Sequence, residues 1–234
     1  MKQIRALFPA TILIALFTGM MLLLSGCSVM EEEVQESYLF AVGTGRCTVQ
    51  EALIYLLNIQ GAYTDDIGDS LWPSMVSGDA SVQETAEDLV ISRLLYIYCM
   101  DQMAENEGVA LTEEEENLIS SAAAAYMETL TASDLEILDV DAGDIEEYYA
   151  HFALAEKYYD EKTADVIISQ TASSEEEQEA LLEEAKEAAI EADYEEFLAG
   201  VQIEVDETVL SEAAEAAGNV TTNQFFEIYN GYMQ

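Results

Sequence analysis

The 234-residue sequence contains little positive charge, histidine, cysteine or proline. Lys and Arg together number 7 against 48 Asp and Glu, so the formal net charge is −41. This sign excludes a nucleic-acid-binding protein, because such a protein needs a basic surface to neutralise phosphates. One histidine and three cysteines are too few for a multi-ligand zinc site, and we expect no metal and no cofactor. The only two prolines, Pro9 and Pro73, leave long helices unbroken.

Hydrophobic residues make up 50% of the chain, which separates it from disordered acidic tails. This fraction is sufficient to bury a core. The length corresponds to one domain, or to one domain with an insert.

The first 27 residues have the order of an export signal. Basic residues at positions 2 and 5 precede an uncharged stretch over 6–24, and the segment 24–27 reads LSGC. A basic start, an apolar stretch and small residues before a cleavage point are typical of a secretory signal. The LSGC segment resembles the bacterial lipobox, which implies that Cys27 is lipidated and begins the mature chain. An uncleaved membrane helix is the alternative, but it gives no reason for the small pair before Cys27.

We therefore expect residues 1–26 to be a lipoprotein signal peptide and residues 27–37 to be an acidic tether. The mature protein would be anchored through its lipid at the outer face of a bacterial cell membrane. Stable anchoring needs two or more acyl chains.

Capping boxes predict a mainly α-helical body. Each box places Ser or Thr three residues before Glu, so that the hydroxyl and the carboxylate satisfy free N–H groups at a helix start. Four boxes each open a segment with helical periodicity; they are Thr48/Glu51, Ser81/Glu84, Thr112/Glu115 and Ser174/Glu177.

Hydrophobic periodicity extends these starts into whole elements. The apolar middle of Val82–Asn106 predicts a central helix. Alternation predicts strands at Tyr38–Val42 and 201–205, and we expect at most one short two-stranded pairing, between these two. The aromatic stretch Phe225–Tyr232 is expected to dock onto the body. The other expected helices run from about Thr48 to Tyr63, from Thr112, from near Asp144, from Glu175 to Leu198 and from Glu207 to Ala217.

Several motifs follow in order from residue 48 to residue 162. They are the helix TVQEALIYL, an aspartate-rich loop with Trp72, a long apolar helix ending in AENEGVALTEEE, and the helix DIEEYYAHFALAEKYYDEK. In this order they resemble the helical chaperone domain of SurA/PrsA-type extracytoplasmic foldases, a SurA/trigger-factor-type fold. The resemblance implies that residues 38–162 form this domain.

The family continues into a parvulin-type peptidyl-prolyl isomerase domain, and here the sequence departs from it. Only residues 163–203 occupy that place, and they contain no His, Cys or Met. We expect 163–200 to be an acidic helical connector and 201–234 to be a return segment that completes the helical domain. The single histidine, His151, lies in a helix with no second base to orient it and is interpreted as a packing or surface residue, so we expect no catalytic residue.

These patterns favour a membrane-anchored chaperone that holds unfolded, exported polypeptides without isomerising prolines. Two alternatives remain open at this point, namely an isomerase with residual activity and a non-catalytic envelope adaptor. The sequence does not specify the oligomeric state.

Aromatic residues supply the candidate client-binding surface. The chain has 13 tyrosines, several in pairs one or two residues apart, and one member of each pair must point away from a single core face. Such rings suit either helix packing or a shallow groove for apolar client segments. The residues that we assign to client binding are Trp72, Tyr126, Tyr148, Tyr149 and Phe152.

Two further features favour ordinary structural roles. Residues 139–144, DVDAGD, lack the spacing of a calcium loop and predict a helix N-cap. Cys47 and Cys99 are expected to be free thiols, with a disulfide as the alternative.

Overall fold

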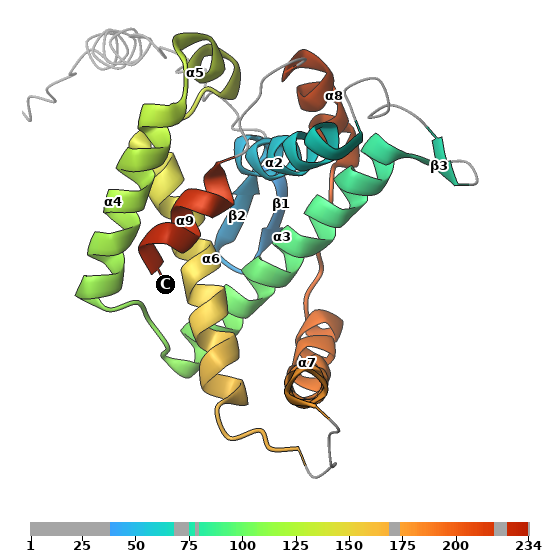
Figure 1. Ribbon diagram of the computed structural model, residues 1–234, viewed down its shortest axis with the longest axis vertical. Coiled ribbons are helices and arrows are strands. Elements are labelled where there is room, and N and C mark those ends of the chain that lie inside the picture. The colour runs from blue at the N-terminus through green and yellow to red at the C-terminus, as the bar shows by residue number, and fades with distance from the viewer. Residues whose placement is uncertain (1–37, 68–74, 78–79, 169–173, 218–223, 234) are drawn as a thin grey trace, which may run out of the picture. The chain divides into compact units, whose positions relative to one another are not determined.

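The computed structural model describes residues 38–67, 75–77, 80–168, 174–217 and 224–233 (Figure 1). Within these ranges the chain forms eight helices and two small two-stranded sheets, which confirms a mainly α-helical fold. The predicted signal peptide, Cys27, the tether and Trp72 lie outside the described residues.

A tight hairpin opens the described chain. Strand β1 (Tyr38–Val42) pairs antiparallel with β2 (Gly45–Thr48), and Gly43 takes a φ of 59° in the turn between them. The predicted pairing of β1 with residues 201–205 is wrong, because those residues form no strand. Among the described residues, one backbone hydrogen bond connects this part of the chain with β1, from the N–H of Asp206 to the carbonyl of Leu39. A two-residue turn closes with far less loss of chain entropy than a loop of more than a hundred residues.

Helices α2 (Val49–Ile67) and α3 (Val82–Glu107) form the centre of the body. The α3 helix packs against α2, the β1–β2 hairpin, helix α6 (Ala142–Thr163) and helix α7 (Glu175–Gly200). The prediction of a central helix is therefore confirmed. A second hairpin, β3 (Met75–Ser77) with β4 (Ala80–Ser81), lies between α2 and α3, and the sequence patterns did not indicate it.

The middle of the chain contains α4 (Glu113–Thr129), α5 (Ala132–Leu138) and α6. Thr112 caps α4 with the predicted reciprocal box. The α5 helix was not predicted, and its box pairs Thr131 with Asp134 where our pattern required Glu. Asp139 ends α5 in a left-handed conformation, and Asp141 then caps α6 through the backbone N–H groups of the next turn. Residues 139–144 are thus a helix N-cap, as predicted.

The last described elements are α7, α8 (Glu207–Ala217) and α9 (Phe225–Met233). The α8 helix packs against α2, and α9 packs against α4 and α2 (Figure 1). Tyr149 donates a hydrogen bond of 2.8 Å to the carbonyl of Phe225, whose own N–H reaches Asn58 at 3.1 Å. These bonds fix the start of α9 in the core. The described residues between α6 and α8 contain α7 and no strand.

Candidate functional site

Most of the predicted client-binding residues lie in the core. Tyr126, Tyr148 and Tyr149 have exposed fractions of 0%, 4% and 0%, so they cannot contact a client on the surface. Their rings pack inside the body, as in the edge contact of Tyr126 with Tyr149 at 6.5 Å. Tyr148 and Tyr149 are buried because α6 is covered by both α3 and α4 and so has more than one buried face. Tyr126 is buried because α4 packs against both α6 and α9. The assignment of these three tyrosines to client binding is therefore wrong, and the helix-packing interpretation holds for them.

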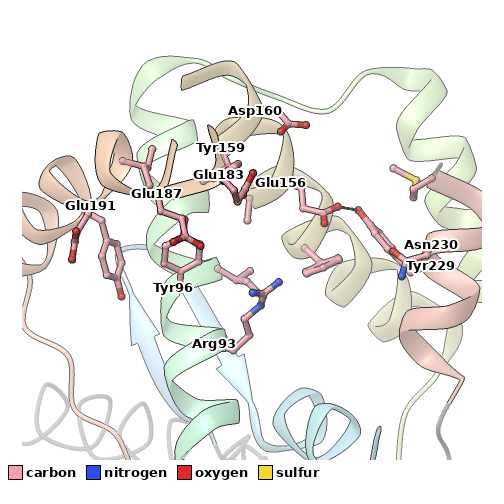
Figure 2. Close-up of a pocket in the computed structure, with 16 residues that line it drawn as sticks. Arg93, Tyr96, Glu156, Tyr159, Asp160, Glu183, Glu187, Glu191, Tyr229 and Asn230 are labelled. Carbon is pink, nitrogen blue, oxygen red and sulfur yellow. Dashed lines mark hydrogen bonds between the residues drawn. The ribbon is translucent and has the colours of Figure 1, made fainter. Parts of the chain in front are cut away.

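Phe152 behaves differently, because it lines an open cleft of about 810 Å³ that α3, α6, α7 and α9 enclose (Figure 2). The cleft borders the packed core: Phe152, Ile190 and Tyr229 line it although they are only 7%, 3% and 2% exposed. Side chains from four helices reach it. Its aromatic and aliphatic lining includes Tyr96, Phe152, Tyr159, Ile190, Tyr194 and Tyr229.

Tyrosine pairs explain how two of these rings reach the cleft. Helix residues one apart point about 100° apart and those two apart about 200° apart, so paired tyrosines cannot share one narrow face. On α3, Tyr98 is buried while Tyr96 lines the cleft. On α6, Tyr158 is buried while Tyr159 lines the cleft. The expectation that one tyrosine of each pair leaves the core therefore holds for these two pairs and indicates the site. It fails for Tyr148 and Tyr149, the pair that we assigned to client binding, because both are buried.

Contacts between helices hold the cleft rings in place. The ring of Tyr96 lies 5.1 Å from that of Tyr194, and Phe152 lies 4.7 Å from Tyr229 in an edge arrangement. The Tyr159 hydroxyl donates to Glu183 at 2.9 Å, and the Tyr229 hydroxyl donates to Glu156 at 2.9 Å. Because the hydroxyls of Tyr159 and Tyr229 already have partners inside the protein, their rings offer mainly apolar surface to the cleft.

Burial raises the pKa of these phenols. The pKa of Tyr194 rises to about 12, chiefly through burial, and that of Tyr159 rises through burial and through its bond to Glu183. Both rings are therefore uncharged near neutral pH, and the carboxylates determine the charge of the cleft.

Five acidic side chains and one basic side chain line the cleft. The acidic residues are Glu156, Asp160, Glu183, Glu187 and Glu191. Arg93 is the basic residue, and its guanidinium lies 5.6 Å from the centre of the Phe152 ring. Burial raises the pKa of Glu156, while the Tyr229 hydroxyl and the charge of Arg93 oppose that rise. A concave surface with this excess of carboxylates concentrates a negative potential.

A second polar cluster surrounds His151, and the expectation that no other group orients this ring was wrong. The Nδ1 atom of His151 lies 2.6 Å from Oδ2 of Asp101, and Nε2 lies 3.6 Å from Glu147. Its ring stacks on Tyr98 at 4.5 Å. Asp101 is 50 residues away in the chain and on another helix, so no local pattern could indicate that it orients His151.

The hydrogen bonds around His151 favour its charged form near neutral pH. Burial lowers its pKa, but hydrogen bonds to Asp101 and Glu147 and the charge of Glu51 outweigh that effect and raise the pKa to about 10. The ring is then an imidazolium with no free lone pair. Glu51 is 0% exposed and accepts a hydrogen bond of 2.7 Å from the Tyr98 hydroxyl. The cluster therefore links α2, α3 and α6 inside the body.

The remaining candidate features, namely metal ligands, thiols and membrane-spanning helices, do not indicate a second functional site in the described residues. In the described part of the chain, no group of three or more His, Cys, Asp and Glu side chains is arranged to hold a metal ion. Cys47 and Cys99 are buried free thiols, and burial raises the pKa of Cys99 to about 11. None of the helices in the described ranges combines the length and the apolar composition that a membrane span requires.

The cleft between α3, α6, α7 and α9 is thus the candidate functional site. No protein-family model, no curated protein and no solved structure matches this chain.

Proposed function

We propose that this protein is a membrane-anchored extracytoplasmic chaperone, similar to SurA/PrsA-type foldases, that holds segments of exported polypeptides without isomerising prolines. The observation that carries the proposal is the open cleft of about 810 Å³ lined by aromatic side chains from four helices. This volume lies within the range of about 300–1,000 Å³ that binding clefts occupy. It accommodates a few client side chains at a time.

The lining suits transient binding of varied sequences. Tyrosine and phenylalanine lose little conformational entropy on binding and offer both an apolar face and a polar edge. Met233 adds a flexible thioether that adapts to differently shaped partners. A holdase needs this kind of contact, because its clients share exposed apolar residues and no common sequence.

The strong negative charge supports the same proposal. A net charge of −41 keeps complexes with unfolded clients soluble through mutual repulsion. It also repels the body from anionic headgroups, so a lipid at Cys27 would tether the cleft near the membrane without pressing it against the surface.

The absence of catalytic groups in the described part of 163–203 favours holding over isomerisation. There, α7 forms the wall of the cleft, with Ile190 and Tyr194 in its lining. The connector expected from the sequence would then serve as part of the client-binding surface.

Suppression of aggregation tests the proposal. The full chain in a nonionic detergent is mixed with a reduced model client, and light scattering is followed over time. Protection is expected for the wild type and a clear loss for the double variant Tyr96→Ala/Tyr194→Ala, which removes two touching rings of the cleft. Tyr232→Ala is the matched control, since this ring is 41% exposed and lies outside the cleft lining.

Two results would overturn the proposal. One is an absence of protection by the wild type at molar excess. The other is equal protection by the cleft variant and the wild type, with both folded by circular dichroism. If capture from envelope extracts then gave one stoichiometric partner, the adaptor alternative would replace the chaperone.

A further inference from the structure

We infer that the cleft selects extended client segments in which Lys or Arg alternates with apolar residues. This inference rests on the proposed chaperone function and names the class of client. It follows from the arrangement of carboxylates on α7 opposite the aromatic wall of the cleft.

The α7 carboxylates form a regular row. Glu183, Glu187 and Glu191 are four residues apart, and all three line the cleft. With a rise of 1.5 Å per residue, successive members of the row are about 6 Å apart along the helix. Alternate side chains on one face of an extended chain are about 6.6 Å apart. Cationic side chains at every second position of a client would therefore match the row.

The row has little internal neutralisation. Glu183 accepts the Tyr159 hydroxyl and lies 3.9 Å from Lys186. Among the described residues, neither Glu187 nor Glu191 forms an ion pair. These two carboxylates are exposed and can contact an incoming cation.

The opposite side of the cleft is mainly aromatic, and its nearest carboxylate, Glu156, already accepts a hydrogen bond from the Tyr229 hydroxyl (Figure 2). Figure 2 shows Glu187 and Glu191 on one side of Arg93, and Tyr229 with Asn230 on the other. Tyr229 packs against Phe152, and Met233 of α9 also contributes to the lining. An extended segment between α7 and α9 would present one face to the carboxylates and the other to these rings. An anionic segment would be repelled, and a neutral apolar segment would use only half of the site.

Arg93 limits where a client cation can lie. Its guanidinium stays over the Phe152 ring at 5.6 Å. A cation near it would be repelled, so the favourable positions are beside the α7 row, away from Arg93. The single arginine therefore supports a fixed orientation of the client, with its cationic face toward α7.

Binding of labelled peptides tests this inference. Fluorescence anisotropy is measured for the full chain in nonionic detergent, with micelles alone as the blank. Three nine-residue peptides are compared: alternating Lys and Leu, the same composition with the lysines in one block, and alternating Ser and Leu. The alternating Lys peptide is expected to bind most tightly, by about tenfold over the Ser peptide at low salt and by less at high salt.

Variants locate the effect on the protein. Neutralising the row with Glu183→Gln, Glu187→Gln and Glu191→Gln should weaken the alternating Lys peptide about tenfold and leave the Ser peptide unchanged. The control variant replaces three exposed glutamates of the same helix that lie outside the cleft lining, namely Glu184→Gln, Glu195→Gln and Glu196→Gln. It removes the same net charge and should leave binding of both peptides unchanged.

The outcomes separate this inference from the proposed function. If both triple variants weaken binding of the alternating Lys peptide equally, the effect comes from overall charge. If the alternating and block peptides bind equally, the spacing of the lysines does not matter. Either result overturns the inference while binding of the Ser peptide maintains the chaperone proposal. If none of the three peptides binds, the cleft is not a client site and both proposals fail.

Discussion

The completely buried carboxyl of Glu51 should make the stability of the protein depend on pH in a predictable way. Its Oε2 atom accepts a hydrogen bond from Tyr98, while Oε1 has no hydrogen-bond partner in the described structure. Burial raises the pKa of Glu51 from 4.5 to about 7, although the positive charge of His151 and the Tyr98 hydroxyl oppose the rise. The folded protein therefore retains a proton that the unfolded chain releases.

The sign and size follow from this difference. Because the folded-state pKa is raised, the contribution to stability is fully present below pH 4.5 and is lost as the pH rises to about 7. A difference of this size corresponds to about 3 kcal/mol of unfolding free energy at 1.36 kcal/mol per pKa unit. Above pH 7 the loss is complete and no longer changes.

Glu51→Gln removes this titration, since an amide does not titrate and its oxygen can still accept from Tyr98. The free energy of unfolding is measured by urea titration and circular dichroism between pH 4.5 and 8.5, on the full chain in nonionic detergent. The variant-minus-wild-type difference should grow by about 3 kcal/mol across this range. An exposed control on α8, Glu212→Gln, should give a flat difference. A flat difference for Glu51→Gln as well would refute the reasoning.

Three other changes give independent tests. Thr112→Ala removes the reciprocal cap of α4 and should lower the free energy of unfolding by about 1 kcal/mol in urea titrations; an unchanged value would contradict the role of the cap. Arg93→Gln removes the basic side chain from the cleft and should strengthen binding of the alternating Lys peptide about twofold in the anisotropy assay, whereas weaker binding would mean that Arg93 assists the client. Cys27→Ser should abolish incorporation of labelled palmitate and release the protein from membranes, and persistent labelling would disprove the lipobox assignment.

Local signals in the sequence predicted most helices. The body helices beginning at Val82, Glu113 and Glu175 start where capping residues and apolar periodicity agree, because both depend on residues within one or two turns. The short α5 helix was missed because its box uses Asp134. The strand at Tyr38–Val42 was also predicted, but its partner was not, since pairing depends on which loop closes with the smallest loss of chain entropy.

The candidate site was only partly predictable. Phe152 was named, and the tyrosine-pair rule indicated that rings would leave the core, but the rule could not say which pairs would do so. Tyr148 and Tyr149 are both buried because α6 contacts α3 and α4 together. The contact of His151 with Asp101 joins two helices, and nothing near either residue in the chain indicates it.

By itself, the sequence determined the helical class, most helix starts and the excess of acidic residues, because each depends on composition or on neighbours within a few residues. The tertiary structure decided which aromatic rings are buried, which line the cleft and which carboxylates share it. These properties arise where α3, α6, α7 and α9 meet. The packing of segments far apart in the chain sets the burial and the charge of that site.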